Sequence, residues 1–209
     1  MSTNKGRRMA ETEASLIPQQ LQKSIIGLTN PLIKILSRWG IKPNAVTVAG
    51  VITTACAAVI ILLGYIRWGG VLILLGGLCD MIDGILARYT HTSTRFGALL
   101  DSTIDRYAEF VMFFGIAAYF FFETDYWSLV AVFLALCGSL MVSYTRARAE
   151  GLGFEAKIGL MQRAERIVII GLGALIHPIA LKVAIWLVAF FANYTAAQRI
   201  MYVYKQDVK

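Results

Sequence analysis

The fold is decided by Asp80-Met-Ile-Asp83-Gly84-Ile-Leu-Ala87-Arg88 and, after a short link, Phe96-Gly97-Ala-Leu-Leu-Asp101-Ser-Thr-Ile-Asp105-Arg106. Four aspartates lie here in sequence that is otherwise apolar enough to enter a bilayer. An ionised side chain at membrane depth is expensive, and such residues usually mark a functional site. Asp80 and Asp83 are three residues apart, and Asp101 and Asp105 are four apart, so each pair shares one helix face.

We expect the two segments to form an antiparallel helical hairpin that turns near Thr92. In such a hairpin Asp83 lies opposite Asp101, and Asp80 lies opposite Asp105. Four facing carboxylates do not stay ionised and unpaired in a dry site, and all-oxygen ligands suit hard divalent cations. The alternative is a set of structural ion pairs with the neighbouring arginines, Arg88, Arg95 and Arg106. We favour the metal site because intramembrane carboxylates are rare.

The composition is that of a membrane protein. Of 209 residues, 57% are hydrophobic and only 16% are charged. The predicted fold is an all-α integral membrane protein, with six transmembrane helices and an N-terminal amphipathic juxtamembrane helix. Residues 1–15 are expected to form a flexible polar tail, 16–42 an amphipathic helix on the membrane surface, and 43–209 the membrane domain.

Six apolar spans are expected, at about 45–66, 70–88, 96–122, 126–144, 167–176 and 179–197. The fifth span is short, so we expect its helix to begin within 163–166. The net charge of +7 does not indicate a nucleic-acid partner, because Lys and Arg gather at the chain ends and between spans. That distribution places both termini and the turn of the aspartate hairpin on the cytoplasmic side, so we expect the aspartate site to open to the cytoplasm.

The aspartate stretch resembles the signature of the CDP-alcohol phosphotransferase family of membrane enzymes. Its eight signature positions are filled by Asp80, Asp83, Gly84, Ala87, Arg88, Gly97, Asp101 and Asp105. The resemblance implies that an alcohol attacks the β-phosphorus of a CDP-linked lipid and that CMP is released. It also implies a bacterial or archaeal cell membrane.

The resemblance assigns metal-binding roles to Asp80, Asp83 and Asp101. Asp105 is the implied general base and a further metal ligand. Two cations would clamp the diphosphate of the lipid, with Mg²⁺ the expected ion and Mn²⁺ the alternative.

The resemblance also implies a pocket for the CDP-lipid. Gly84 and Ala87 follow the first two aspartates by one helical turn and would leave a groove for the nucleotide; helix packing alone is the other explanation. The full set of expected CDP-lipid contacts is Pro43, Asn44, Ala45, Val46, Gly84, Ala87, Arg88, Thr94 and Gly97.

Five arginines favour a phosphorylated acceptor, because guanidinium groups match phosphate geometry. They are Arg146, Arg148, Arg163, Arg166 and Arg199. Their pattern is similar to the bacterial branch of the family that makes phosphatidylinositol phosphate, although lysine is common there at the position of Arg146. CDP-diacylglycerol and inositol phosphate are therefore the expected substrates, and glycerol-3-phosphate is the alternative acceptor.

Two other classes of membrane protein also place acids among apolar helices. A polyprenyl transferase has more widely separated acidic motifs, and a transporter predicts matching acids in the second half of the chain, which this sequence lacks. Membrane lipids are expected partners. The family implies a homodimer, for which the fourth and sixth spans offer apolar faces.

Overall fold

The computed structural model describes residues 19–92 and 94–208, with side chains from residue 29 onward. Within these ranges every regular element is a helix, as predicted. The helices are α1 (Gln19–Arg38), α2 (Pro43–Leu62), α3 (Ile66–Tyr89), α4 (Arg95–Phe122), α5 (Tyr126–Gly151), α6 (Arg163–Ile176) and α7 (Pro178–Asp207). The expected tail 1–15 lies outside the described residues.

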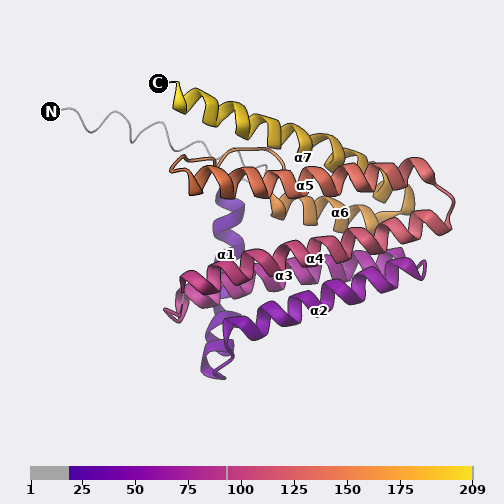
Figure 1. Ribbon diagram of the computed structural model, residues 1–209. Helices are drawn as coiled ribbons and strands as arrows, with labels where there is room; N and C mark the ends of the chain where they lie inside the picture. The colour runs from indigo at the N-terminus through magenta and orange to yellow at the C-terminus, as the bar shows by residue number, and fades with distance from the viewer. Residues whose placement is uncertain (1–18, 93, 209) are drawn as a thin grey trace.

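Helices α2 to α7 run along a common axis, and α1 crosses one end of them (Figure 1). Consecutive helices run in opposite directions; the connections are short turns except for the longer segment 152–162 between α5 and α6. As a result α2, α4 and α6 begin at the end of the bundle where α3, α5 and α7 finish. The expected hairpin is α3 and α4, and its turn includes Thr92.

Small residues allow the helix backbones to approach closely. A Cβ atom built on Gly115 of α4 would lie 2.6 Å from Ala58 of α2, and one on Gly70 of α3 would lie 2.8 Å from the Gly171 carbonyl oxygen of α6. Large apolar side chains fill the remaining interior, and one buried cluster runs through α2 to α7. A smaller cluster joins α1 to α3 through Ile33, Ile82 and Leu86.

Among the described residues, α2, α3, α5 and α7 are long and apolar enough to cross a membrane. The chain is therefore an integral membrane protein. The other two predicted spans, α4 and α6, do not meet these criteria of length and apolar composition. Helix α4 has 28 residues but carries the acidic residues of the site, and α6 has only 14 residues. Helices α5 and α7 extend beyond the predicted 126–144 and 179–197 because their polar C-terminal turns stay helical.

A buried ion pair ties α4 to α6. Arg166 is fully buried, and Nε and Nη2 donate to Oε1 of Glu109 over 3.0 and 2.7 Å. Its Nη1 donates to the Met161 carbonyl oxygen over 3.2 Å. The pair connects residues far apart in the sequence and links the first turn of α6 to the middle of α4 through their side chains.

Glu109→Gln removes the charge that balances the buried Arg166 guanidinium. Breaking one side of a buried pair costs about 3–5 kcal/mol, so we expect a clearly lower thermal unfolding midpoint in detergent. Glu123→Gln is the matched control, because Glu123 is exposed at the other end of α4.

The double variant Glu109→Gln with Arg166→Met tests whether the loss comes from the unpaired charge. We expect it to recover part of the stability lost in Glu109→Gln, since it no longer contains an unpaired buried charge. If the double variant loses as much stability as Glu109→Gln and Arg166→Met lose separately, added together, the two side chains are not coupled.

Candidate active site

The hairpin brings three aspartates from two helices together. Asp80 of α3 and Asp101 and Asp105 of α4 each offer a carboxylate oxygen, and these oxygens all lie within 4.8 Å of one another. Asp105 is buried. The sequence predicted Asp80 opposite Asp105 and Asp83 opposite Asp101; Asp83 does not belong to this group of three.

Asp83 lies on the same helix face as Asp80 and is 4% exposed. Its Oδ2 is buried and has no hydrogen-bond partner in the part of the chain that the structure describes. Asp80, Asp83 and Asp105 line one cavity between α2, α3, α4 and α6. A buried carboxylate oxygen without a partner indicates a missing ligand, since such groups are normally satisfied.

The cation beside these carboxylates is Arg163, the first residue of α6. Its Nη1 pairs with Asp80 and its Nη2 lies 3.0 Å from Oδ1 of Asp105. Arg106 makes a longer contact, 3.4 Å from Nη1 to Oδ2 of Asp105. From the sequence, Arg106 was considered as an ion-pair partner of the aspartates, whereas Arg163 was expected to contact the acceptor.

The aspartates fit a divalent metal ion. All the available ligands are carboxylate oxygens, which Mg²⁺ and Mn²⁺ prefer, and the Oδ2 of Asp83 is free to bind. The residues that would hold such ions are Asp80, Asp83, Asp101 and Asp105.

The predicted CDP-lipid residues lie at the same end of the bundle as the turn between α3 and α4. Pro43 begins α2, Asn44 and Ala45 are exposed, and Val46 packs on the small cluster that joins α1 to α3. Ala87 is half-buried on α3. The N-termini of α2 and α4 both lie here, and helix N-termini favour anions such as phosphate.

Two predicted glycines have different surroundings. A Cβ on Gly84 would meet only the guanidinium of Arg88, at 3.7 Å, so the surface beside Gly84 is open. A Cβ on Gly97 would lie 2.9 Å from Oγ1 of Thr94. Thr94 caps α4 by accepting a hydrogen bond from the Gly97 backbone N–H over 2.9 Å, so this pair shapes the start of the helix.

The five predicted acceptor arginines have different environments. Arg163 contacts the aspartates, and Arg166 is committed to Glu109. Arg199 is buried and donates to the carbonyl oxygens of Val142 and of Ile158, the latter over 2.7 Å.

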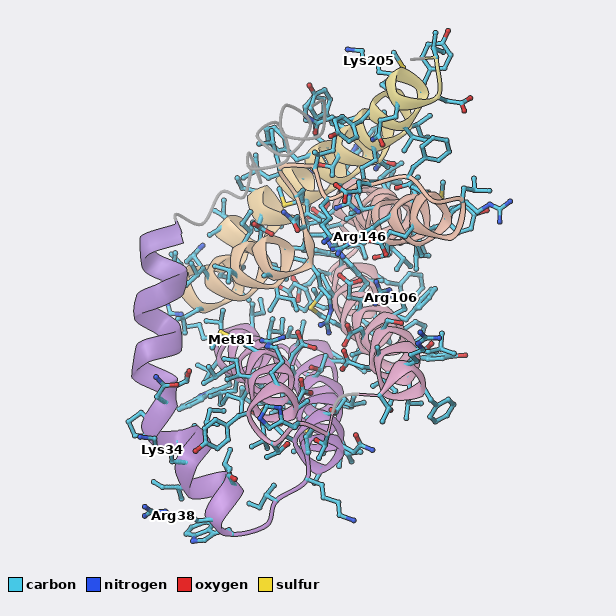
Figure 2. The ribbon with its side chains drawn as sticks, turned by 90° about the vertical axis from the view of Figure 1, so that its left-hand side faces the viewer. Lys34, Arg38, Met81, Arg106, Arg146 and Lys205 are labelled. Atoms are coloured by element: carbon cyan, nitrogen blue, oxygen red, sulfur yellow. The ribbon has the colours of Figure 1, made fainter. Side chains whose placement is uncertain are left out.

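Two of the five arginines remain near solvent. Arg146 pairs with Glu150 over 2.9 Å on the outside of α5, and Arg148 is exposed. Figure 2 views the bundle from this end, with Met81 on α3, Arg106 on α4 and Arg146 on α5. The structure therefore does not gather all five arginines in one pocket, and their contact with an acceptor stays a prediction.

Glu109 is a residue of this site that was not predicted from the sequence. It lines the same cavity as Asp105 and follows it by one helical turn, so Asp101, Asp105 and Glu109 form one acidic row along α4. The i, i+4 spacing of that row was the available signal.

Comparisons with known proteins agree with this site. Residues 41–197 match the family described as CDP-alcohol phosphatidyltransferase. The phosphatidylinositol phosphate synthase of Mycobacteroides abscessus is 37% identical over 180 residues, which cover 83% of this chain and 82% of that protein. The archaetidylinositol phosphate synthase of Pyrococcus horikoshii is 40% identical over 169 residues, which cover 80% of this chain and 86% of that protein.

Solved structures of the Mycobacterium tuberculosis phosphatidylinositol phosphate synthase are also similar. The structure with CDP-DAG bound matches with a TM-score of 0.77 and 33% identity, over 84% of this chain and 93% of that one. The structure in complex with manganese and citrate matches with the same TM-score and identity, over 84% and 88% of the two chains. The resemblance drawn from the aspartate signature is thus confirmed: this chain belongs to the CDP-alcohol phosphatidyltransferase family and is a transferase.

Proposed function

We propose that the chain transfers a phosphatidyl group from CDP-diacylglycerol to inositol phosphate and releases CMP. The observation that carries this proposal is the group of four aspartates on α3 and α4, with the start of α6 and its Arg163 beside them. Relatives named for the synthesis of phosphatidylinositol phosphate and archaetidylinositol phosphate support the acceptor. The similar structure with CDP-DAG bound supports the donor.

The proposed reaction is an in-line displacement at phosphorus. Bound divalent ions, two Mg²⁺ or alternatively Mn²⁺, would neutralise the diphosphate and stabilise negative charge on the leaving oxygen. Asp80, Asp83 and Asp101 would hold them. The acceptor hydroxyl oxygen bonds to the β-phosphorus, its proton passes to Asp105, and the bond between that phosphorus and the oxygen of CMP breaks. CMP leaves with the electron pair.

The nucleotide is proposed to lie between the start of α2 and the last turns of α3. Residues 43–46 would line one side, and the open surface at Gly84 and Ala87 would admit the cytidine. Thr94 and Gly97 at the start of α4 would lie beside the phosphates, since a helix N-terminus favours negative charge. Arg88 is exposed close to this surface and would neutralise a phosphate.

We propose that α1 lies in the cytoplasmic interface of the membrane. Leu32, Ile35 and Trp39 are exposed apolar side chains, whereas Lys34 and Arg38 lie on the side of α1 away from the bundle (Figure 2). A helix with an apolar and a basic face suits an anionic membrane surface. In this arrangement α2 to α7 are the six spans, and the active site and both termini are cytoplasmic.

A homodimer is also proposed, through the lipid-facing sides of α5 and α7. Phe133 of α5 and Phe190 of α7 are both exposed and apolar. Cross-linking in native membranes would test this assembly.

The acceptor is tested by CMP release from purified protein with Mg²⁺ and CDP-diacylglycerol. Inositol phosphate, glycerol-3-phosphate, serine and free inositol are offered in parallel. We expect release with inositol phosphate and none with free inositol, because the arginines need a phosphate partner. Release with glycerol-3-phosphate alone would keep the reaction class and replace the acceptor.

Asp105→Asn keeps the shape of the side chain but removes the proposed base. We expect transfer to fall by about 10²–10⁴-fold or more, while CDP-diacylglycerol still binds. Glu123→Gln is the control, because it removes a carboxylate from the far end of α4. Loss of lipid binding by a folded Asp105→Asn protein would show that Asp105 serves the donor and not the acceptor hydroxyl.

A further inference from the structure

Helices α4 and α6 face each other through two ion pairs, one turn apart. Asp105 and Glu109 of α4 are separated by four residues, and Arg163 and Arg166 of α6 by three. Asp105 pairs with Arg163 over 3.0 Å, and Glu109 pairs with Arg166 over 2.7 Å. The first pair lies beside the aspartates, and the second lies deeper in the bundle.

The two arginines are held very differently. The side chain of Arg166 is 0% exposed, and Nε, Nη1 and Nη2 all donate hydrogen bonds. The side chain of Arg163 is 20% exposed, and its Nε has no hydrogen-bond partner among the described residues. Breaking the deep pair leaves a buried charge, whereas Arg163 has access to water and fewer bonds to lose.

Arg163 occupies carboxylate oxygens that divalent ions would also use. Its guanidinium bridges Asp80 and Asp105, whose oxygens belong to the group within 4.8 Å. A divalent ion bound to these oxygens would lie within a few ångströms of a positive guanidinium. Like charges at that distance repel strongly in a partly dry site.

We propose that Arg163 is a switch residue that couples metal binding to acceptor binding. Without ions it neutralises Asp80 and Asp105; when ions bind, they displace its guanidinium, which then becomes available to the acceptor phosphate. The Glu109–Arg166 pair holds the first turn of α6, so the side chain of Arg163 moves and the helix does not. This inference rests on the proposed function, whose metal site and acceptor it connects.

The coupling has two measurable consequences. An arginine that competes with the ions weakens metal binding, so removing it strengthens metal binding. By linkage, metal ions and acceptor must also strengthen each other's binding by one common factor. Both consequences are binding equilibria and need no turnover.

The first test measures Mn²⁺ affinity of the purified full chain, without lipid or acceptor. We expect Arg163→Gln to bind Mn²⁺ about tenfold more tightly than the wild type, within the usual range of couplings between sites. Arg106→Gln is the matched control, because Arg106 also touches Asp105 but does not bridge two carboxylates. An unchanged affinity in Arg163→Gln, or an equal gain in Arg106→Gln, would overturn the switch.

Arg163→Lys protects the test against a variant that fails to fold. Lysine keeps the positive charge but does not bridge two carboxylates with a planar fork, so we expect a smaller gain in Mn²⁺ affinity than for glutamine. If Arg163→Lys bound Mn²⁺ with the same affinity as the wild type, the bridging role of Arg163 would be contradicted.

The second test measures binding of inositol phosphate with and without Mn²⁺. We expect Mn²⁺ to strengthen it about tenfold in the wild type and to have little effect in Arg163→Gln. Equal strengthening in both proteins would overturn the switch while leaving the proposed function intact. Failure of the wild type to bind Mn²⁺ would instead overturn the proposed metal site itself.

Discussion

The concentration of negative charge at one end of a membrane bundle determines how the surrounding helices are arranged. Asp80, Asp83, Asp101 and Asp105 are placed by the hairpin of α3 and α4. Asp83 and Asp105 are buried and the other two are partly exposed. Positive charge surrounds them: the guanidinium of Arg163, the first residue of α6, lies between Asp80 and Asp105. Three helices also begin at this end, and their N-termini are positive. The fold provides cationic surroundings from backbone and side chain together.

Two arginines of α6 neutralise acidic side chains of this region. One of these ion pairs is permanent, and the other can be exchanged for a bound metal ion. Glu109 and Arg166 form the permanent pair, because both side chains are buried and Oε1 of Glu109 accepts two hydrogen bonds from the Arg166 guanidinium. Arg163 is exchangeable, because it competes for oxygens that suit divalent ions. Because the Glu109–Arg166 pair holds the start of α6 in place, the side chain of Arg163 can move without displacing the helix.

The sequence predicted the helices and the aspartate hairpin, but it did not predict which groups the buried arginines contact. Helical spacing and intramembrane acids were enough to place the aspartate hairpin, and the start of α6 within 163–166 was also confirmed. The Glu109–Arg166 pair joins positions 57 residues apart, which no local pattern records. The positive-inside rule predicts on which side of the membrane an arginine lies, but it does not predict which group the arginine binds. Arg199, donating to two backbone carbonyl oxygens, is an example.

We propose that the aspartates hold divalent cations and that the guanidinium of Arg163 moves away when these ions bind. A crystal structure of the chain grown with Mn²⁺, using anomalous scattering to locate manganese, tests this most directly. We expect anomalous density bounded by Asp80, Asp83, Asp101 and Asp105, with the Arg163 guanidinium turned away from Asp80 and Asp105. No anomalous density among these carboxylates, with Arg163 still bridging Asp80 and Asp105, would contradict it.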